Sequence, residues 1–200
     1  MGNTICCQFI MDFHPKKPNY ELKLREMFHT AEFTDVVFEA SDGTRIPAHR
    51  NVVAIWSPLL KTRWKSTANK KTPIVNMKDL DGSALWHFLA FMYGHEEPVS
   101  LESIMSGVSL LEAAHEYDVS DLVEVMDSKL HLIIKEQIKE TEEETLLIVL
   151  KVAGQAGAMA TFKSVFEKLG RETGPNIIKK LYLSEDTRDH EVANKLVTMT

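Results

Sequence analysis

The spacing of apolar residues changes early in the chain. Between residues 20 and 29 apolar side chains fall three and four positions apart, the spacing of one helix face. Over residues 34–40 every second residue is apolar, which is typical of a strand with one buried face. Asp42-Gly43 is a strong hairpin signal before a second strand over 45–47. Pro47 has no backbone N–H, so this strand is predicted at a sheet edge.

The middle of the chain returns to the helical spacing. A helix is predicted to begin at Pro58, because proline suits a first helical position. Ser57 is its predicted N-cap residue. Leu59, Leu60 and Trp64 fit this helix. The polar and basic stretch from Lys61 to Lys71 is interpreted as a loop, and a third strand is predicted over 72–77. Other helices are predicted over residues 49–56, 85–92, 104–111 and 122–133. This order indicates an α+β fold, a small mixed sheet enclosed by short helices.

The last third of the chain is predicted to be a helical region. Thr141 and Glu144 form a capping-box pattern at the start of an apolar helical run. A second helix is expected to stop at Gly170, and Gly174-Pro175 is expected to open a third. A last, weakly apolar helix is predicted over 190–197.

Composition places the chain among ordinary globular proteins. Its 200 residues are 44% hydrophobic and 26% charged, with a net charge of −6. This acidic balance disfavours a nucleic-acid partner. The two cysteines, Cys6 and Cys7, are adjacent and form no disulfide framework or zinc ribbon. No apolar run is long enough to span a membrane.

The amino terminus carries a possible lipidation signal. Gly2 begins a sequence close to an N-myristoylation motif, although Cys6 replaces the usual Ser or Thr. Cys6 and Cys7 are then candidate palmitoylation sites, and two lipids anchor a protein far better than one. The alternative is that residues 1–18 are a flexible tail without lipids.

The sequence motifs that mark common classes of enzyme are incomplete or missing in this chain. His115-Glu116 begins like a zinc-protease HExxH motif, but Val119 stands where the second histidine belongs. No phosphate-binding GxxxxGK[ST] loop occurs, and no nucleophile, base and orienting residue are grouped. We therefore expect a protein that is not an enzyme, with no catalytic residue, cofactor or metal.

Five short motifs occur in the order and spacing of one known family. They are FTDV at 33–36, IPAHR at 46–50, VAIWSPLL at 53–60, FLAFMYG at 88–94 and LLEAAHEY at 110–117. Over about residues 20–132 the chain resembles the BTB/POZ family, although the glycine of the fourth motif comes one residue early. The resemblance implies a BTB/POZ domain over 19–135. By position and helical character, 136–200 resembles the BACK-like helical extension of many such proteins.

The resemblance implies a homodimer formed through the first helix. Its candidate interface residues are Tyr20, Leu24, Met27 and Phe28. An apolar face exposed in a monomer needs covering, which favours this role. The alternative is that these side chains pack on their own domain.

The resemblance also implies a charged pocket near the dimer interface. Asp35, His49 and Arg50 stand at its positions, and a carboxylate with a guanidinium can form a charge-assisted pair. His49 is expected to be a half-buried structural histidine.

Many relatives with a helical extension are substrate adaptors of cullin-based ubiquitin ligases. Their cullin-binding signature is a hydrophobic-x-Glu motif after the SP-containing helix. Here Leu60 and Trp64-Lys65-Ser66 stand in that region, with Ser66 where Glu is expected. This departure weakens the cullin interpretation. The basic loop could instead bind phosphate or an acidic partner.

Three functions remain open from the sequence. The leading one is a homodimeric adaptor that links an unknown substrate protein to a cullin in the cytoplasm. The second is a dimerising scaffold that does not engage a cullin and is membrane-associated if Gly2, Cys6 and Cys7 are acylated. The third is a transcriptional co-regulator, which requires a nuclear location.

Overall fold

The computed structural model describes residues 19–66, 72–95, 103–137, 141–182 and 187–198. The elements in these ranges are α1 (Tyr20–Thr30), β1 (Val36–Ala40), β2 (Arg45–Ala48), α2 (Arg50–Trp56), α3 (Pro58–Ser66), β3 (Ile74–Met77), α4 (Gly82–Met92), α5 (Ile104–Glu116), α6 (Ser120–Gln137), α7 (Glu143–Ala156), α8 (Met159–Tyr182) and α9 (Thr187–Val197). The predicted α+β class is confirmed.

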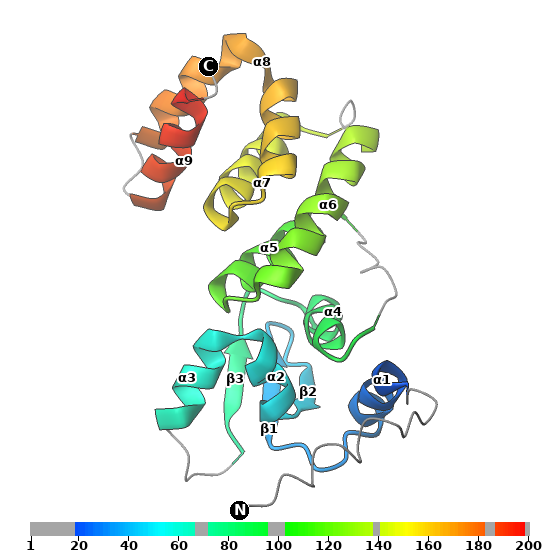
Figure 1. Ribbon diagram of the computed structural model, residues 1–200. Coiled ribbons are helices and arrows are strands. Elements are labelled where there is room, and N and C mark those ends of the chain that lie inside the picture. Colours follow the sequence, from blue (N-terminus) through cyan, green and yellow to red (C-terminus); the bar gives the residue numbers. More distant parts are fainter. Residues whose placement is uncertain (1–18, 67–71, 96–102, 138–140, 183–186, 199–200) are drawn as a thin grey trace, which may run out of the picture.

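A three-stranded sheet lies in the lower half of the molecule as drawn in Figure 1, with α1 and α3 on opposite sides of it. The strand order is β2-β1-β3, with β1 antiparallel to β2 and parallel to β3. Pro47 pairs with Val37 on the edge strand, as its missing N–H predicts. Val36 and Phe38 are fully buried, so the two-residue spacing correctly marked the inner face.

The hairpin turn also fastens the sheet to α4. Asp42 accepts hydrogen bonds from the backbone N–H of Thr44 at 2.8 Å and of Gly82 at 3.0 Å. Gly43 has φ +82°, a conformation that costs glycine little. Hydrogen bonding to these N–H groups lowers the pKa of the Asp42 carboxyl.

The upper half of the molecule is made by α7, α8 and α9 (Figure 1). Helix α7 packs on α5 and α8 packs on α6, while α9 packs on α7 and α8. Asp127 of α6 joins the two halves. Its carboxylate accepts the N–H groups of Ala160 at 3.0 Å and Thr161 at 2.7 Å, in the first turn of α8. The Thr161 hydroxyl donates to the backbone carbonyl of Asp127 at 2.9 Å. Asp127 thus satisfies N–H groups that a helix start leaves without internal partners.

Two expectations for the last third are wrong. Thr141 does not cap α7: Glu142 is the N-cap residue, and the Thr141 hydroxyl donates to the Gln137 carbonyl at 2.9 Å. The free carbonyls at the end of α6 therefore attract this hydroxyl.

The predicted break near Gly170 and Gly174-Pro175 does not separate two helices, since α8 is helical throughout. Figure 1 shows that α8 instead bends and turns back. A proline inside a helix removes one hydrogen bond and favours such a bend. After the bend, Ile177 is buried, and with Leu181 it lines an apolar hollow on α7. This burial offsets the weak helix propensity of glycine and proline.

We expect Asp127→Ala to lower the free energy of unfolding by about 1–3 kcal/mol, because two N–H groups at the start of α8 lose their acceptor. Urea unfolding followed by circular dichroism measures the change. Glu136→Ala, an exposed carboxylate on the same helix, is the matched control. A loss no larger than that of the control would contradict this role of Asp127.

Candidate functional site

Helix α1 carries the predicted dimer residues on different sides. Phe28 is buried against its own domain, with its ring stacked on Tyr93 at a centroid distance of 4.7 Å. Leu24 and Met27 are half-buried beside the same core. Tyr20 points outward and is 70% exposed. The structure therefore places Phe28 inside the domain and leaves Tyr20 available to a partner.

Three of the other exposed apolar side chains lie on or near α1 and α2, and the sequence did not single them out as interface residues. Leu22 of α1 is 58% exposed, Ile55 of α2 is 77% exposed, and Phe33 is 93% exposed. Phe33 also has φ +60°, in the left-handed region, where a bulky residue is strained by about 1–2 kcal/mol. The helical and strand spacings cannot identify these residues, since exposure depends on what packs nearby.

Asp35 and Arg50 are brought together as predicted from their chemistry. The Asp35 carboxylate accepts the backbone N–H of Arg50 at 2.7 Å and its side-chain Nε–H at 2.9 Å. It thereby satisfies the first N–H of α2, whose N-cap residue His49 makes no side-chain capping bond. The pair is partly exposed, at 45% for Asp35 and 30% for Arg50, so it can also meet a partner.

His49 turns away from this pair and into the domain. Its backbone N–H donates to the Tyr93 hydroxyl at 2.8 Å, and its Nδ1 lies 2.8 Å from the same oxygen. Its Nε2 lies 2.6 Å from the Glu32 carbonyl oxygen, which can only accept, so Nε2 carries the proton. His49 is therefore a structural residue that joins the α1–β1 connection to the end of α4.

Helix α3 replaces most of the predicted basic loop. The expectation of a loop from Lys61 to Lys71 is wrong for residues 61–66, which are helical. No glycine or proline interrupts this stretch, and apolar residues recur at the helical spacing. Leu60 is buried and Trp64 is half-buried against the core. Residues 67–71 lie outside the described part of the chain.

Helix α3 exposes three basic residues, Lys61, Arg63 and Lys65. Of the predicted cullin-facing residues, Lys65 therefore lies on the surface, and only the backbone of Ser66 is described. The helix is anchored by Ser57, which donates to the Tyr117 carbonyl at 2.5 Å and accepts the N–H of Leu60 at 3.1 Å.

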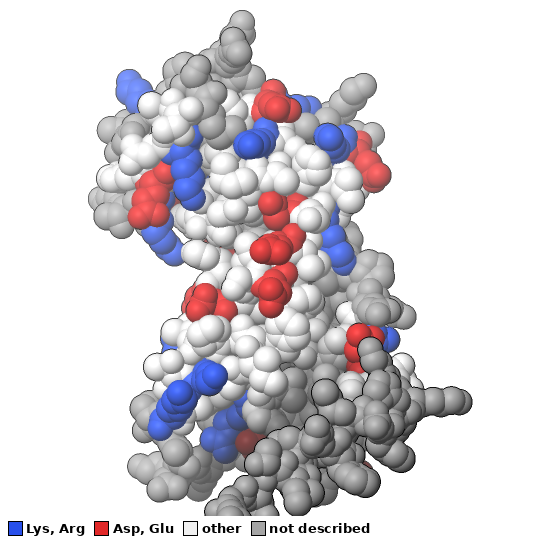
Figure 2. Space-filling view, viewed as in Figure 1, with Lys and Arg blue, Asp and Glu red and all other residues white. Residues whose placement is uncertain are grey.

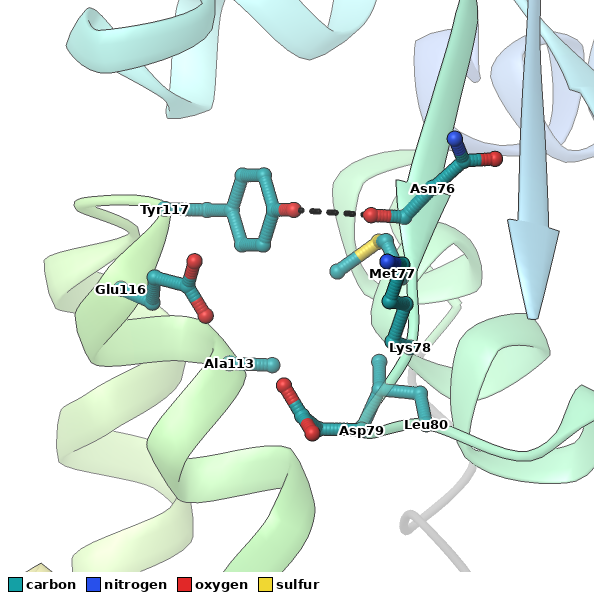
Figure 3. A pocket seen from close by; sticks show the side chains of 8 residues that line it. All are labelled: Asn76, Met77, Lys78, Asp79, Leu80, Ala113, Glu116 and Tyr117. Carbon is teal, nitrogen blue, oxygen red and sulfur yellow. Dashed lines mark hydrogen bonds between the residues drawn. The ribbon is translucent and has the colours of Figure 1, made fainter. Parts of the chain in front are cut away.

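A small polar pocket adjoins this surface where β3 and α5 end. It has a volume of about 140 Å³ and is lined by Asn76, Met77, Lys78, Asp79, Leu80, Ala113, Glu116 and Tyr117. The Tyr117 hydroxyl donates to the Asn76 carbonyl at a long 3.4 Å (Figure 3). Burial raises the pKa of Tyr117, while the positive charge of Arg63 acts in the opposite direction. The tyrosine stood in a sequence motif, but nothing in the motif indicated a pocket.

The comparison with known families decides what this domain is. A family model described as the BTB/POZ domain matches residues 24–133. The chain belongs to the BTB/POZ family. The resemblance read from the five motifs is thereby confirmed, and the chain contains a protein-interaction domain.

Similar proteins carry the same domain in different settings. The chain is 32% identical over 102 residues to a BTB/POZ domain-containing protein of Arabidopsis thaliana, covering 50% of this chain and 30% of that protein. It is 30% identical over 122 residues to the alpha isoform of protein tramtrack of Drosophila melanogaster, covering 61% of this chain and 14% of that protein. The chain is also 30% identical over 121 residues to the Drosophila melanogaster protein named longitudinals lacking protein-like, covering 60% of this chain and 91% of that protein. The match thus spans less than a third of the first two relatives.

The BTB/POZ match lies inside the predicted domain of residues 19–135. The helices beyond it are α7, α8 and α9, and their description as a BACK-like extension stays a prediction. Gly2, Cys6 and Cys7 lie outside the described residues. Within the described ranges, no His, Cys, Asp or Glu side chains are grouped to hold a metal ion. In the same ranges, no helix is long and apolar enough to cross a bilayer.

Tyr93 is expected to give the highest step in an alkaline titration of tyrosinate absorbance. Burial raises its pKa from 10.0 to about 12, so the neutral phenol is favoured in the folded protein. Its contribution to stability is therefore present below pH 10.0 and is lost as the pH rises through about 12. Tyr93→Phe should remove that step and flatten the loss of stability over this pH range.

Tyr20→Phe is the control for this titration, because the exposed Tyr20 ring lies outside the core. It should leave the highest step in place. A highest step that persists in Tyr93→Phe would contradict the assignment.

Proposed function

We propose that this BTB/POZ protein is a homodimerising adaptor that joins partner proteins, with a cullin as the first candidate partner. The observation that carries the proposal is the set of exposed apolar side chains around α1 and α2 of the BTB/POZ domain. These are Tyr20, Leu22, Phe33 and Ile55.

Covering exposed apolar side chains of this size with a partner is favourable. Burying each one contributes about 1.5–3 kcal/mol. Phe33 lies two residues before Asp35, whose carboxylate holds Arg50 at the start of α2. Ile55 lies in the same short helix. A second copy that covers Phe33 would thus approach the Asp35–Arg50 pair, which fits the charged pocket implied by the family resemblance.

The internal packing of Phe28 refines the proposed interface. Phe28 holds α1 on the domain, and the Arg25 guanidinium donates to the Gly94 carbonyl at 2.7 Å. These contacts with its own domain fix the orientation of α1. Tyr20 and Leu22 remain exposed and are the proposed contacts of α1 with a partner. Leu24 and Met27 are half-buried and pack against the core of their own domain.

The same proposal holds that the chain is not an enzyme. The imidazole nitrogens of His49 contact Tyr93 and the Glu32 carbonyl inside the domain. These contacts support a structural role, in which the ring does not face a substrate.

We expect Phe33→Asp combined with Ile55→Asp to abolish dimerisation without unfolding the domain. Aspartate tolerates the left-handed backbone at position 33 better than phenylalanine, so the monomer should lose no stability there. At about 0.5 M salt, where attraction between exposed charges is screened, the wild-type chain should sediment at twice its 22.7 kDa mass. The variant should dissociate at least about tenfold more readily, because two buried apolar contacts become charged.

Leu132→Asp is the matched control for this experiment. Leu132 is 60% exposed on α6, away from α1 and α2 (Figure 1). At the same salt concentration, a control that dissociates as much as the double variant, or a double variant that remains dimeric, would overturn the proposed interface.

Cullin binding is tested by restoring the missing acidic residue. Ser66→Glu recreates the hydrophobic-x-Glu signature after Trp64, so it should bind a cullin N-terminal domain about tenfold more tightly than the wild-type chain. Binding of purified chains is measured by calorimetry. Thr62→Glu, which places the same charge elsewhere on α3, should bind no more tightly than wild type.

If neither the wild-type chain nor Ser66→Glu binds, the cullin interpretation is wrong and the dimerising scaffold remains. Equal gains in Ser66→Glu and Thr62→Glu would also contradict it, because they would reflect net charge alone.

A further inference from the structure

One face of the molecule carries opposite charges in two separate regions. Figure 2 shows lysine and arginine side chains over α3, and acidic side chains over α5 and α6 above them. The basic region comprises the exposed Lys61, Arg63 and Lys65. The acidic region, here called the α5–α6 corner, comprises the exposed Glu112, Glu116, Asp118, Asp121 and Glu124.

The two regions adjoin each other at Tyr117. Ser57 and Tyr117 are hydrogen-bonded across the boundary, which fixes the start of α3 against the end of α5. Arg63 from α3 and Glu116 from α5 are both close enough to shift the pKa of the Tyr117 hydroxyl. The polar pocket of about 140 Å³ lies at this boundary, with Asp79 and Glu116 in its lining (Figure 3). The face is therefore continuous and changes sign across its centre.

Several of these acidic residues stand where they weaken their own fold. Glu116 is the last residue of α5, and Asp118 follows it at φ +56°. The end of a helix is its negative pole, so carboxylates there are repelled by the helix dipole. Glu112 and Glu116 are also like charges four positions apart on one helix. Basic side chains from outside would offset these costs.

We propose that this face pairs with the same face of a second copy of the chain. In a twofold arrangement, the basic α3 of one copy lies against the α5–α6 corner of the other, and the reverse contact forms at the same time. Charge complementarity of this kind favours association and sets its orientation.

The pairing uses side chains of α3, α5 and α6, and none of the four apolar residues of the α1–α2 interface. Figure 1 shows α1 and α3 on opposite sides of the strands. The pairing goes beyond the proposed adaptor function and requires neither the α1 dimer nor a cullin. Where both interfaces form, dimers are joined into larger assemblies, and α3 is covered against any other partner.

A charge-exchange experiment tests the pairing. One variant carries Lys61→Glu and Lys65→Glu, and the other carries Glu116→Lys and Asp121→Lys. Both are made with Phe33→Asp and Ile55→Asp, so that the remaining association is independent of the α1–α2 surface. Sedimentation velocity at low salt compares each variant, their equal mixture and the parent carrying only the two Asp substitutions.

The parent should self-associate, and its association constant should fall about tenfold when salt rises from about 0.05 M to about 0.5 M. Each charge variant alone should associate at least about tenfold more weakly, because like charges then face each other. The mixture should associate nearly as well as the parent, because every basic region again meets an acidic one.

An exchange at the far end of α6, Lys135→Glu with Glu136→Lys, is the matched control and should change nothing. Circular dichroism establishes that every variant is folded. A parent that stays monomeric, charge variants that associate like the parent, or a mixture that fails to recover would each overturn the pairing. These results can be interpreted whether or not the α1–α2 dimer exists, since that surface is altered in every sample.

Discussion

The hydroxyl and ring of Tyr93 hold together three parts of the BTB/POZ domain that are distant in sequence. The hydroxyl accepts the backbone N–H of His49 just before α2, and the ring stacks on Phe28 of α1. Because His49 also donates to the carbonyl of Glu32, this cluster sets the path of the chain between α1 and β1. A buried polar cluster is favourable only when its members are paired, so this geometry permits little displacement.

This constraint explains why the proposed dimer surface has its particular shape. With Phe28 held against Tyr93, α1 cannot turn its whole apolar side outward. The chain leaves α1 through Ala31 and Phe33, both in the left-handed region, and reaches β1 with the Phe33 side chain in solvent. Because Phe33 already holds this conformation in the monomer, less ordering is needed when a partner covers it.

A second fixed point, the hydrogen bond from Ser57 to Tyr117, orients the charged face. It places α3 beside the end of α5, and so brings lysines and carboxylates from separate sequence segments onto one surface. Exposed charges contribute little to the stability of the domain itself. Their effect is greater on encounter with another protein, where their arrangement selects the orientation of the partner.

The sequence alone was sufficient for the fold class, the hairpin and the family, because these depend on local spacing and on short motifs. Val36 and Phe38 had to share a face in any strand, and Pro47 had to lie at an edge. The family resemblance implied that Asp35 and Arg50 lie close together, and their opposite charges favour the pair that forms. Tertiary packing overrode the local signals at Gly174-Pro175, where burial of Ile177 continues the helix, and at Thr141, where a nearby carbonyl attracts the hydroxyl. Only the tertiary structure decided that Phe28 packs inward while Phe33 and Ile55 point outward. It also decided that the start of α3 lies beside the α5–α6 corner of the same molecule, where Ser57 bonds Tyr117. Exposure and charge adjacency depend on which distant segments pack together, and the spacing of residues along a chain does not contain that information.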